Sequence, residues 1–271
     1  MKVNQCLMLL ASAAACVAAL VWVSPSWAQT IPYRTDFEDS AFTVGDLGAG
    51  QDGWSATAGS GAIQTPDNVR SGTQSLEVNP ASVVSRNLDG FGSDRVYIDG
   101  YYRGPTVSET PDPTTLADGS SLVLFHSTNG IMALDGNGTG GGIWVPANPI
   151  VPVATQGLQR MTVCQNYTTQ AWDLYVDKVL IFAGLGFKND SIDKLNGIDI
   201  ETSDSGSGFL DDFSATTAIP EFFSSGMNIS LFEFSGEWGG MNETTFEYDY
   251  PERNDNVNAN DLTELLDRLA E

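Results

Sequence analysis

The stretch AWDLYVDKVLIF, residues 171–182, decides the fold class of this chain. Trp172, Leu174 and Val176 share one side of an extended backbone, because successive side chains of a strand point in opposite directions. Asp173 faces the other side, and this alternation is typical of a half-buried antiparallel strand. A second apolar run follows after only two residues, so the sequence predicts two neighbouring strands joined by a hairpin turn.

Runs of the same kind recur along most of the chain. They are rich in β-branched and aromatic residues and are separated by Gly, Asn, Asp, Ser and Pro, whereas helical periodicity is absent before the last dozen residues. The clearest are SLEV (75–78), RVYIDGYYR (95–103), SLVLFHS (121–127), GIMAL (130–134), GIWV (142–145), RMTVCQNY (160–167), GIDIE (197–201) and FLDDFSAT (209–216). The sequence therefore predicts an all-β fold, an antiparallel sandwich.

The first 28 residues have the features of a secretory signal peptide in the usual order. Lys2 precedes an apolar run over residues 6–23, and the sequence SWA at 26–28 places small residues where a signal peptidase cleaves. The apolar run is close to the roughly 18 residues that span a bilayer, so a transmembrane anchor is the alternative. We expect cleavage after Ala28, no membrane insertion of the mature chain, and a secreted, periplasmic or cell-surface location.

The mature chain is strongly acidic. Removing residues 1–28 takes away one lysine and no acid, so the formal net charge becomes −24 over 243 residues. A field of that sign repels polyanions, which excludes nucleic acid as a partner and makes divalent cations candidate ligands. Cys164 is the single cysteine left, so no internal disulfide forms and stability has to come from a hydrophobic core.

Two long irregular stretches interrupt the predicted strands. Residues 104–119 contain three prolines, and residues 146–157 contain three more. Loops of this length are uncommon in a compact domain unless they cover or bind something. We therefore expect at least one of them to take part in a binding site or to cover the core.

The sequence changes character after Thr217. Residues 218–250 are rich in aromatic and acidic residues and predict an extension with two or three further strands. Residues 251–271 end in a short predicted helix, which Asp261 can cap and in which four leucines form one apolar stripe. A helix this short is marginal alone in water, so we expect it to dock on the sandwich or on a protein partner.

Three segments of the chain resemble a known fold. They are TDFEDSAFTVGDLGAGQDGWSATAGSGAIQTPDNVRSGTQSLEV (35–78), WDLYVDKVLIFAGLGF (172–187) and FLDDFSAT (209–216). Together they resemble the concanavalin A-like jelly rolls of the laminin-G type and similar bacterial carbohydrate-binding modules. The resemblance covers residues 33–217, within an expected sandwich domain of residues 29–217, and implies that the first and last strands lie side by side.

The same resemblance implies a structural calcium ion between the first and last strands. Its acidic ligands would be Glu38 near the start and Asp211 or Asp212 near the end, with backbone carbonyls completing the shell. Adjacent carboxylates repel unless a cation neutralises them, and calcium takes six to eight oxygen ligands. The alternative is that one acid of the pair points inward to a hydrogen bond and the other outward to water.

The run YPERNDNVNANDLTELLDRL (250–269) resembles half of a type I dockerin, the calcium-loop-plus-helix module that attaches bacterial enzymes to scaffolds. The alignment places Asn254, Asn258 and Asp261 at the fifth, ninth and twelfth ligand positions. The first and third positions depart from the motif, and only one copy is present, so the segment is a degenerate dockerin. The alternative is a helix that closes the sandwich.

Catalytic patterns are sparse. His126 is the single histidine, and no G-x-S-x-G elbow accompanies it, so a Ser-His-Asp triad is not indicated. His126 keeps a role only in the alternative that some jelly-roll polysaccharide lyases suggest, with a His and a Tyr as base and acid. Glycoside hydrolysis needs two carboxylates, which 35 acidic residues supply without a recognisable motif. Enzymatic activity is therefore the minority hypothesis.

Exposed aromatic residues are the stronger functional signal. Flat rings stack on the apolar faces of sugars while neighbouring polar groups bond the hydroxyls. We select Tyr101, Tyr102 and Trp144 as candidate ligand-binding residues. Tyr101 and Tyr102 are consecutive on a strand, so only one of them can face the core.

These observations favour an exported, non-catalytic glycan-binding module with a structural calcium ion, whose partner is a polysaccharide or surface glycan. Two alternatives stay open. One is a polysaccharide lyase or hydrolase of the jelly-roll type. The other is a structural or assembly protein of the cell envelope, in which the C-terminal segment contacts a protein partner.

Overall fold

The computed structural model describes residues 29–220, and within them the chain forms sixteen β-strands and one short 3-10 turn. The strands are β1 (Gln29–Thr30), β2 (Tyr33–Thr35), β3 (Gly45–Asp46), β4 (Trp54–Ala58), β5 (Gly61–Gln64), β6 (Ser75–Val78), β7 (Val83–Asp89), β8 (Arg95–Arg103), β9 (Val123–His126), β10 (Gly130–Gly136), β11 (Gly142–Pro146), β12 (Gln159–Asn166), β13 (Ala171–Val176), β14 (Val179–Gly186), β15 (Gly197–Glu201) and β16 (Gly208–Thr216). The 3-10 turn η1 (Pro113–Thr115) lies between β8 and β9.

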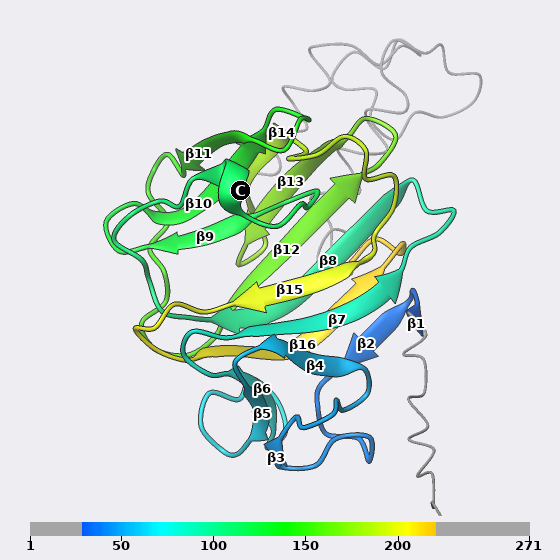
Figure 1. Cartoon of the computed structure of the whole chain (residues 1–271), viewed down its shortest axis with the longest axis vertical. Coiled ribbons are helices and arrows are strands. Elements are labelled where there is room, and N and C mark those ends of the chain that lie inside the picture. The colour runs from blue at the N-terminus through cyan, green and yellow to red at the C-terminus, as the bar shows by residue number, and fades with distance from the viewer. Residues whose placement is uncertain (1–28, 221–271) are drawn as a thin grey trace, which may run out of the picture.

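One large sheet forms the first layer of the molecule. It has nine strands in the order β14-β13-β12-β8-β16-β6-β5-β3, with β2 also paired to β16. Its long central strands, β8, β12 and β16, run antiparallel to their neighbours. Figure 1 shows these strands behind β7 and β15.

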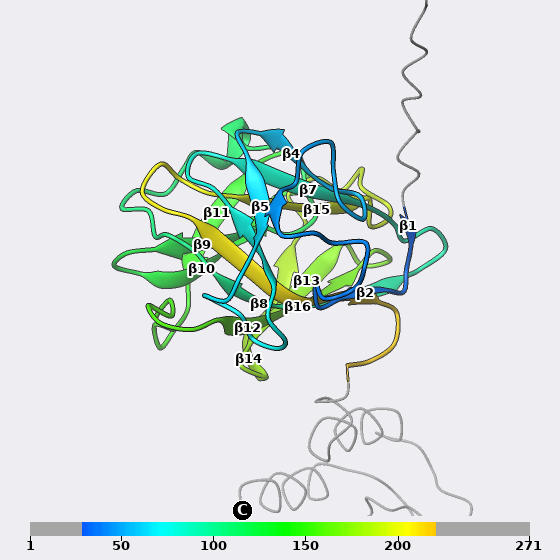
Figure 2. The ribbon, with the colours of Figure 1, turned by 90° about the horizontal axis from the view of Figure 1, so that it is seen from below.

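Two smaller sheets complete the sandwich. In one, β7 pairs with β1, β4 and β15, and the β1–β7 pair is the parallel one. In the other, β10 lies between β9 and β11, and β10 also contacts β14 of the large sheet. Figure 2 shows β4, β7 and β15 on one side and β8, β12 and β16 on the other. The described residues thus confirm the predicted all-β jelly-roll sandwich.

β2, near the start of the sandwich, and β16, its last strand within the described residues, lie side by side. β2 pairs antiparallel with β16, with Thr35 opposite Phe213 and Tyr33 opposite Ala215. This is the arrangement that the jelly-roll resemblance implied. It brings residues about 180 positions apart in the sequence into one sheet, where Glu38 and Asp211 come close to the same loop.

Large aromatic side chains fill one end of the core. Phe37, Trp54 and Phe213 are fully buried, with the Trp54 ring 5.3 Å from that of Phe213 and 5.8 Å from that of Phe37. Trp54 Nε1 donates to the hydroxyl of Tyr33, 3.0 Å away, so the indole has a partner despite its burial. Burying each such ring contributes on the order of 2–3 kcal/mol, which matters because Cys164, the cysteine of residues 29–220, forms no disulfide.

The second long irregular stretch covers the core. Val151 and Val153 pack against the buried cluster, and the carbonyl oxygen of Val151 accepts a hydrogen bond of 2.8 Å from Ile131 N in β10. Gly130 passes so close that a β-carbon there would lie 2.1 Å from that carbonyl oxygen. The close approach and the positive φ of 67° at Gly130 explain why glycine stands at the start of β10.

Several predictions fall on residues that the structure does not describe. They are the signal peptide (1–28), nearly all of the aromatic extension (218–250), and the dockerin-like loop with its helix (251–271). Among residues 29–220, no helix is both long and apolar enough to cross a membrane.

Candidate ligand-binding site

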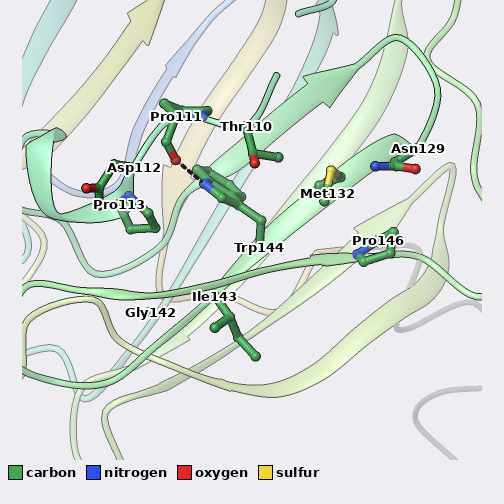
Figure 3. Close-up of a pocket in the computed structure, with 10 residues that line it drawn as sticks. All are labelled: Thr110, Pro111, Asp112, Pro113, Asn129, Met132, Gly142, Ile143, Trp144 and Pro146. Atoms are coloured by element: carbon green, nitrogen blue, oxygen red, sulfur yellow. Dashed lines mark hydrogen bonds between the residues drawn. The ribbon is translucent and has the colours of Figure 1, made fainter. Parts of the chain in front are cut away.

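A surface pocket lies between the β10–β11 hairpin and the first long loop, residues 104–119. It is a shallow depression of about 560 Å³ that is open to solvent. Its lining residues are Thr110, Pro111, Asp112, Pro113, Asn129, Met132, Gly142, Ile143, Trp144 and Pro146. They come from β10, β11, the turn before β10 and the 104–119 loop, and Figure 3 shows them around the indole. The 104–119 loop therefore forms one wall, as its length suggested.

Trp144 is the aromatic surface of this pocket. It lies on β11 opposite Leu134 of β10, and Met132 lies opposite Pro146 in the same hairpin. Because residues two apart on a strand share a face, Trp144, Met132 and Pro146 point to the same side. The indole is half-buried, and its Nε1 donates a hydrogen bond of 2.9 Å to the carbonyl oxygen of Pro111 (Figure 3). That bond fixes the ring against the loop.

The remaining lining residues divide into apolar and polar groups. Met132 is buried beneath the pocket, and Pro111 and Pro113 flank the indole. Thr110 lies beside the ring and contributes a hydroxyl, whereas Asn129 lies farther away, beyond Met132, and contributes an amide, as Figure 3 shows. An aromatic surface with a few polar groups at its edge matches the amphipathic surface of a sugar ring.

Asp112 shapes the loop wall. Its Oδ1 accepts hydrogen bonds from the backbone N of Thr114 at 2.9 Å and from the Thr114 hydroxyl at 2.8 Å, which caps η1. These bonds hold the pKa of the Asp112 carboxyl below its usual value. Asp112 is therefore ionised across neutral pH, and one of its oxygens is already used by the loop itself.

Tyr101 and Tyr102 do not share the pocket with Trp144. Tyr102 packs against the hydrophobic core, and desolvation raises the pKa of its hydroxyl. Tyr101, the next residue along β8, lies on the opposite face of the large sheet. The sequence argument that only one of the pair faces the core agrees with this placement.

Tyr101 lies among arginine side chains. The guanidinium carbons of Arg70 and Arg160 are 4.9 and 5.9 Å from the centre of its ring. Arg160 also forms a two-point ion pair with the buried Asp99, with Nε–Oδ1 and Nη2–Oδ2 distances of 3.0 and 2.8 Å. Thr162 donates to the same carboxylate. Much of the polar chemistry around Tyr101 is thus already satisfied within the protein.

The three acids expected to hold calcium gather around one loop. Glu38 accepts hydrogen bonds from the backbone N of Thr73 and Gln74, and Asp211 accepts from Arg70 and Ser71, at 2.7 and 3.1 Å. Asp212 Oδ1 accepts from the Ser71 hydroxyl at 2.6 Å. Each carboxylate is therefore directed at N–H or O–H donors of residues 70–74.

The Asp211-Asp212 pair matches the alternative stated for it. Asp211 is fully buried and hydrogen-bonded, whereas Asp212 is only partly covered and lies in a bulge of β16 between Asp211 and Ser214, with a positive φ of 48°. Within residues 29–220, no group of three or more His, Cys, Asp or Glu side chains converges as metal ligands. The residues as placed do not fit a calcium ion, and calcium binding stays a prediction.

His126 is the last residue of β9, and its side chain stabilises the turn that follows. Its Nδ1 accepts hydrogen bonds from the backbone N of Thr128 and Asn129, at 3.0 and 3.1 Å, and the ring is buried. Nδ1 is thus occupied, and His126 is not among the lining residues of the Trp144 pocket. His126 thus belongs to the β9–β10 turn among the described residues, and the lyase alternative stays a prediction.

Sequence reasoning found Trp144 and the loop but missed Thr110, Asn129 and Met132. The signal for Met132 lay in the spacing of GIMAL and GIWV, whose pairing register places it two residues from the Leu134–Trp144 pair. Thr110 and Asn129 enter through loop geometry, for which the sequence carried no comparable pattern.

No protein-family model matches the chain, and none of the curated proteins compared with it does. By structure, 78% of the chain aligns with 22% of a sialidase, at 8% sequence identity and a TM-score of 0.44. The receptor-binding domain of botulinum neurotoxin D aligns over 70% of this chain and 50% of its own, at 10% identity and a TM-score of 0.42. The CBM22-1 xylan-binding domain of Xyn10C from Paenibacillus barcinonensis aligns over 68% and 92%, at 17% identity and a TM-score of 0.32.

The chain thus spans half or less of the length of the sialidase and of the toxin domain. Because all three TM-scores are below 0.5, these similarities carry no argument about what this chain binds. The site geometry has to carry that argument.

Proposed function

We propose that this protein is a non-catalytic glycan-binding module and that the Trp144 pocket is its binding site. The observation that carries the proposal is the half-buried indole, fixed by its 2.9 Å bond to Pro111, with Met132 of the paired strand beside it and the Thr110 hydroxyl near its edge. A rigid aromatic ring loses little conformational entropy on binding and stacks on the C–H face of a sugar. The ligand class is a polysaccharide or surface glycan.

The volume and openness to solvent support an oligosaccharide chain more than an enclosed small molecule. About 560 Å³ accommodates one or two sugar units against the indole, and the exposed Ile143 beside the pocket leaves the rim open to more of the chain. Thr110, which lies beside the indole, is placed to bond a hydroxyl group of the sugar. The described residues show no catalytic pair around the indole, which is why binding is the function proposed.

The experiment is a glycan array followed by affinity electrophoresis on the polysaccharides that score. Trp144→Ala should abolish retardation on a polysaccharide that retards the wild type. Phe91→Ala is the matched control, because Phe91 is an 81% exposed aromatic residue outside the pocket. No retardation of the wild type on any neutral or acidic polysaccharide would contradict the proposal, as would equal loss in both variants.

We also propose that the chain acts outside the cytoplasm, because residues 1–28 have the features of a secretory signal peptide. Calcium binding is a separate prediction with its own test. Thermal unfolding of the mature protein with calcium and then with excess chelator provides that test. Binding to the folded state alone at a hundredfold excess over Kd stabilises by about 2.7 kcal/mol, which is a readable shift in Tm. An unchanged Tm after addition of the chelator would contradict the prediction that the protein binds calcium.

A further inference from the structure

The most deeply buried cation of the described residues lies behind the loop wall of the pocket. The Lys188 side chain is 1% exposed. Its Nζ donates to the carbonyl oxygens of Leu116 and Ala117, at 2.9 and 3.1 Å, and to Asp118 Oδ1 at 3.2 Å. An ammonium group has three hydrogens, so these three oxygens use all of its donors. All three belong to consecutive residues of the 104–119 loop.

Lys188 holds the loop at the point where η1 ends. Leu116 terminates the turn, and its N donates to the carbonyl oxygen of Pro113 at 3.3 Å. At the other end of the same turn, Asp112 forms the cap and Pro111 accepts the Trp144 indole N–H. The pocket wall therefore lies between two fixed points, one of which is the buried ammonium group.

We propose that Lys188 is a positioning residue for the Trp144 pocket, an internal cation that holds the loop wall in its binding conformation. The inference rests on the proposed function for its effect on affinity. Its effect on the loop stands on the contacts alone. Lys188 touches none of the pocket, so it acts through residues 112–118 rather than on the ligand.

The role belongs to the charge rather than to the volume of the side chain. A methionine at position 188 fills similar space but donates no hydrogen bond, so the carbonyl oxygens of Leu116 and Ala117 and Oδ1 of Asp118 lose the ammonium group. Asp118 Oδ2 keeps its bond of 3.1 Å from the Asn189 amide. An acceptor that loses its donor and stays away from water costs more than the bond itself contributed, so the carbonyl groups gain by turning towards solvent. The loop then recovers hydration by moving away from the sandwich, and the wall beside Trp144 moves with it.

The test compares Lys188→Met with Lys194→Met in the full mature protein. Lys194 is the matched control, because it also pairs with an aspartate, Asp89, at 3.1 Å, but lies outside the Trp144 pocket. Hydrogen–deuterium exchange should become faster at residues 113–118 in Lys188→Met and stay unchanged there in Lys194→Met. If the formed wall falls to about a tenth of the population, affinity for the glycan falls about tenfold.

Chemical rescue separates charge from packing. Lys188→Ala leaves space for methylammonium, which should slow the exchange of residues 113–118 and recover affinity, whereas the same concentration of sodium should not. Asp118→Asn is the second variant in case the lysine variants do not fold, because the Asp118 side chain is 62% exposed and tolerates change. It should loosen the same residues to a smaller degree.

Unchanged exchange at residues 113–118 in Lys188→Met and Asp118→Asn would overturn the proposal. If exchange at residues 113–118 becomes faster in Lys188→Met but no glycan binds the wild type, Lys188 still holds the loop. That result would contradict the proposed function instead. Faster exchange with unchanged glycan affinity would also overturn the positioning role. The role of Lys188 is thus tested by exchange rates and by the affinity of the variants, whereas the proposed function is tested by glycan binding of the wild type.

Discussion

Three tryptophans of the described residues have the same chemistry and different roles. Trp54 and Trp172 are buried, and their indole N–H groups donate to Tyr33 and to the carbonyl oxygen of Gly186. Trp144 bonds a loop carbonyl in the same way but keeps part of its ring exposed. Strand position decides this difference, because β11 is the edge of its sheet.

Trp144→Phe separates stacking from loop fixation. Phenylalanine keeps an aromatic surface but loses the N–H that bonds Pro111, and one such bond is worth about 1 kcal/mol. We expect glycan affinity to fall about fivefold, well short of the loss in Trp144→Ala. Isothermal titration calorimetry measures both. Equal losses in the two variants would show that the ring itself contributes nothing.

Cys164 should be an unreactive thiol. It is buried beside Tyr97 and Tyr175, and desolvation raises its pKa from 9.0 to about 11. The stability that this shift represents is present below the unfolded pKa and is lost as pH rises towards the folded pKa, between about 9 and 11. Ellman's reagent at pH 8 should label Cys164 only after denaturant is added; rapid labelling of the native protein would contradict its burial.

At the scale of single residues, the sequence predicted the character of an environment better than its partners. The alternation around Tyr101 and Tyr102 predicted that they face opposite sides, and they do. The pairing of Lys188 with residues 116–118 had no signal, because the contact joins positions about 70 apart. Long-range polar contacts of this kind depend on the final packing.

At the scale of elements, the central strands of the large sheet are joined by a buried ion pair. Arg160 of β12 and Asp99 of β8 lie on paired strands, and Thr162 completes the carboxylate's bonds. Arg160→Met should destabilise the protein by about 3 kcal/mol, because it leaves a mostly buried carboxylate without its cation. Urea unfolding measures the change; a loss below about 0.5 kcal/mol would show that the pair is effectively solvated.

The loop at residues 70–74 should respond to pH through two acids with opposite shifts. Desolvation raises the pKa of Glu38, but the backbone N–H groups of Thr73 and Gln74 outweigh it and hold the pKa below its usual value. The contribution of Glu38 is therefore present above its unfolded pKa, about 4.3, and is lost as pH falls through its folded pKa. Glu38→Gln should destabilise the protein at pH 7 and have little effect at pH 3.

Asp211 has the reverse dependence. Desolvation raises its pKa in spite of bonds from three backbone N–H groups, so its favourable contribution is present at low pH and is lost as pH rises through its folded pKa. Asp211→Asn should thus be better tolerated at pH 7 than at pH 3. Thermal unfolding at the two pH values, with chelator present, checks both variants. The same pH trend in both would contradict the assigned shifts.

Sequence reasoning missed strands for two different reasons. β7 is the central strand of the sheet that also contains β1, β4 and β15. Its sequence is VVSRNLD, and Val84, Arg86 and Leu88 all face inward. Arg86 interrupts the apolar pattern but is buried, with its guanidinium 4.4 Å from the centre of the Tyr33 ring and paired with Asp52 at 3.6 Å. A buried cation of this kind breaks the alternation that identifies strands. The short strands β1 to β5 offered too few residues for a pattern.

At the scale of the whole molecule, the fold followed from the sequence and the site followed only in part. Recurrent alternation predicted the sandwich, and the resemblance placed β2 beside β16. The binding residues did not form one site, because Tyr101 and Trp144 lie on different sheets. Which loop meets which hairpin is a property of the assembled sandwich.

Export is the prediction that belongs to the intact chain. The protein should be recovered outside the cytoplasm with an N-terminus at Gln29, because the small residues at 26–28 define the expected cleavage site. Edman sequencing or mass spectrometry of the exported protein reads this directly. An intact N-terminus retained with the membrane fraction would favour the anchor alternative.

The most direct test of the central claim is isothermal titration calorimetry of the mature protein with the glycan selected by the array, for wild type and Trp144→Ala. Loss of a central aromatic contact typically costs 2 kcal/mol or more, so the account predicts an affinity at least about thirtyfold lower in the variant. Equal affinity in wild type and Trp144→Ala, with Tyr101→Ala abolishing binding, would move the site to the other sheet and contradict the account.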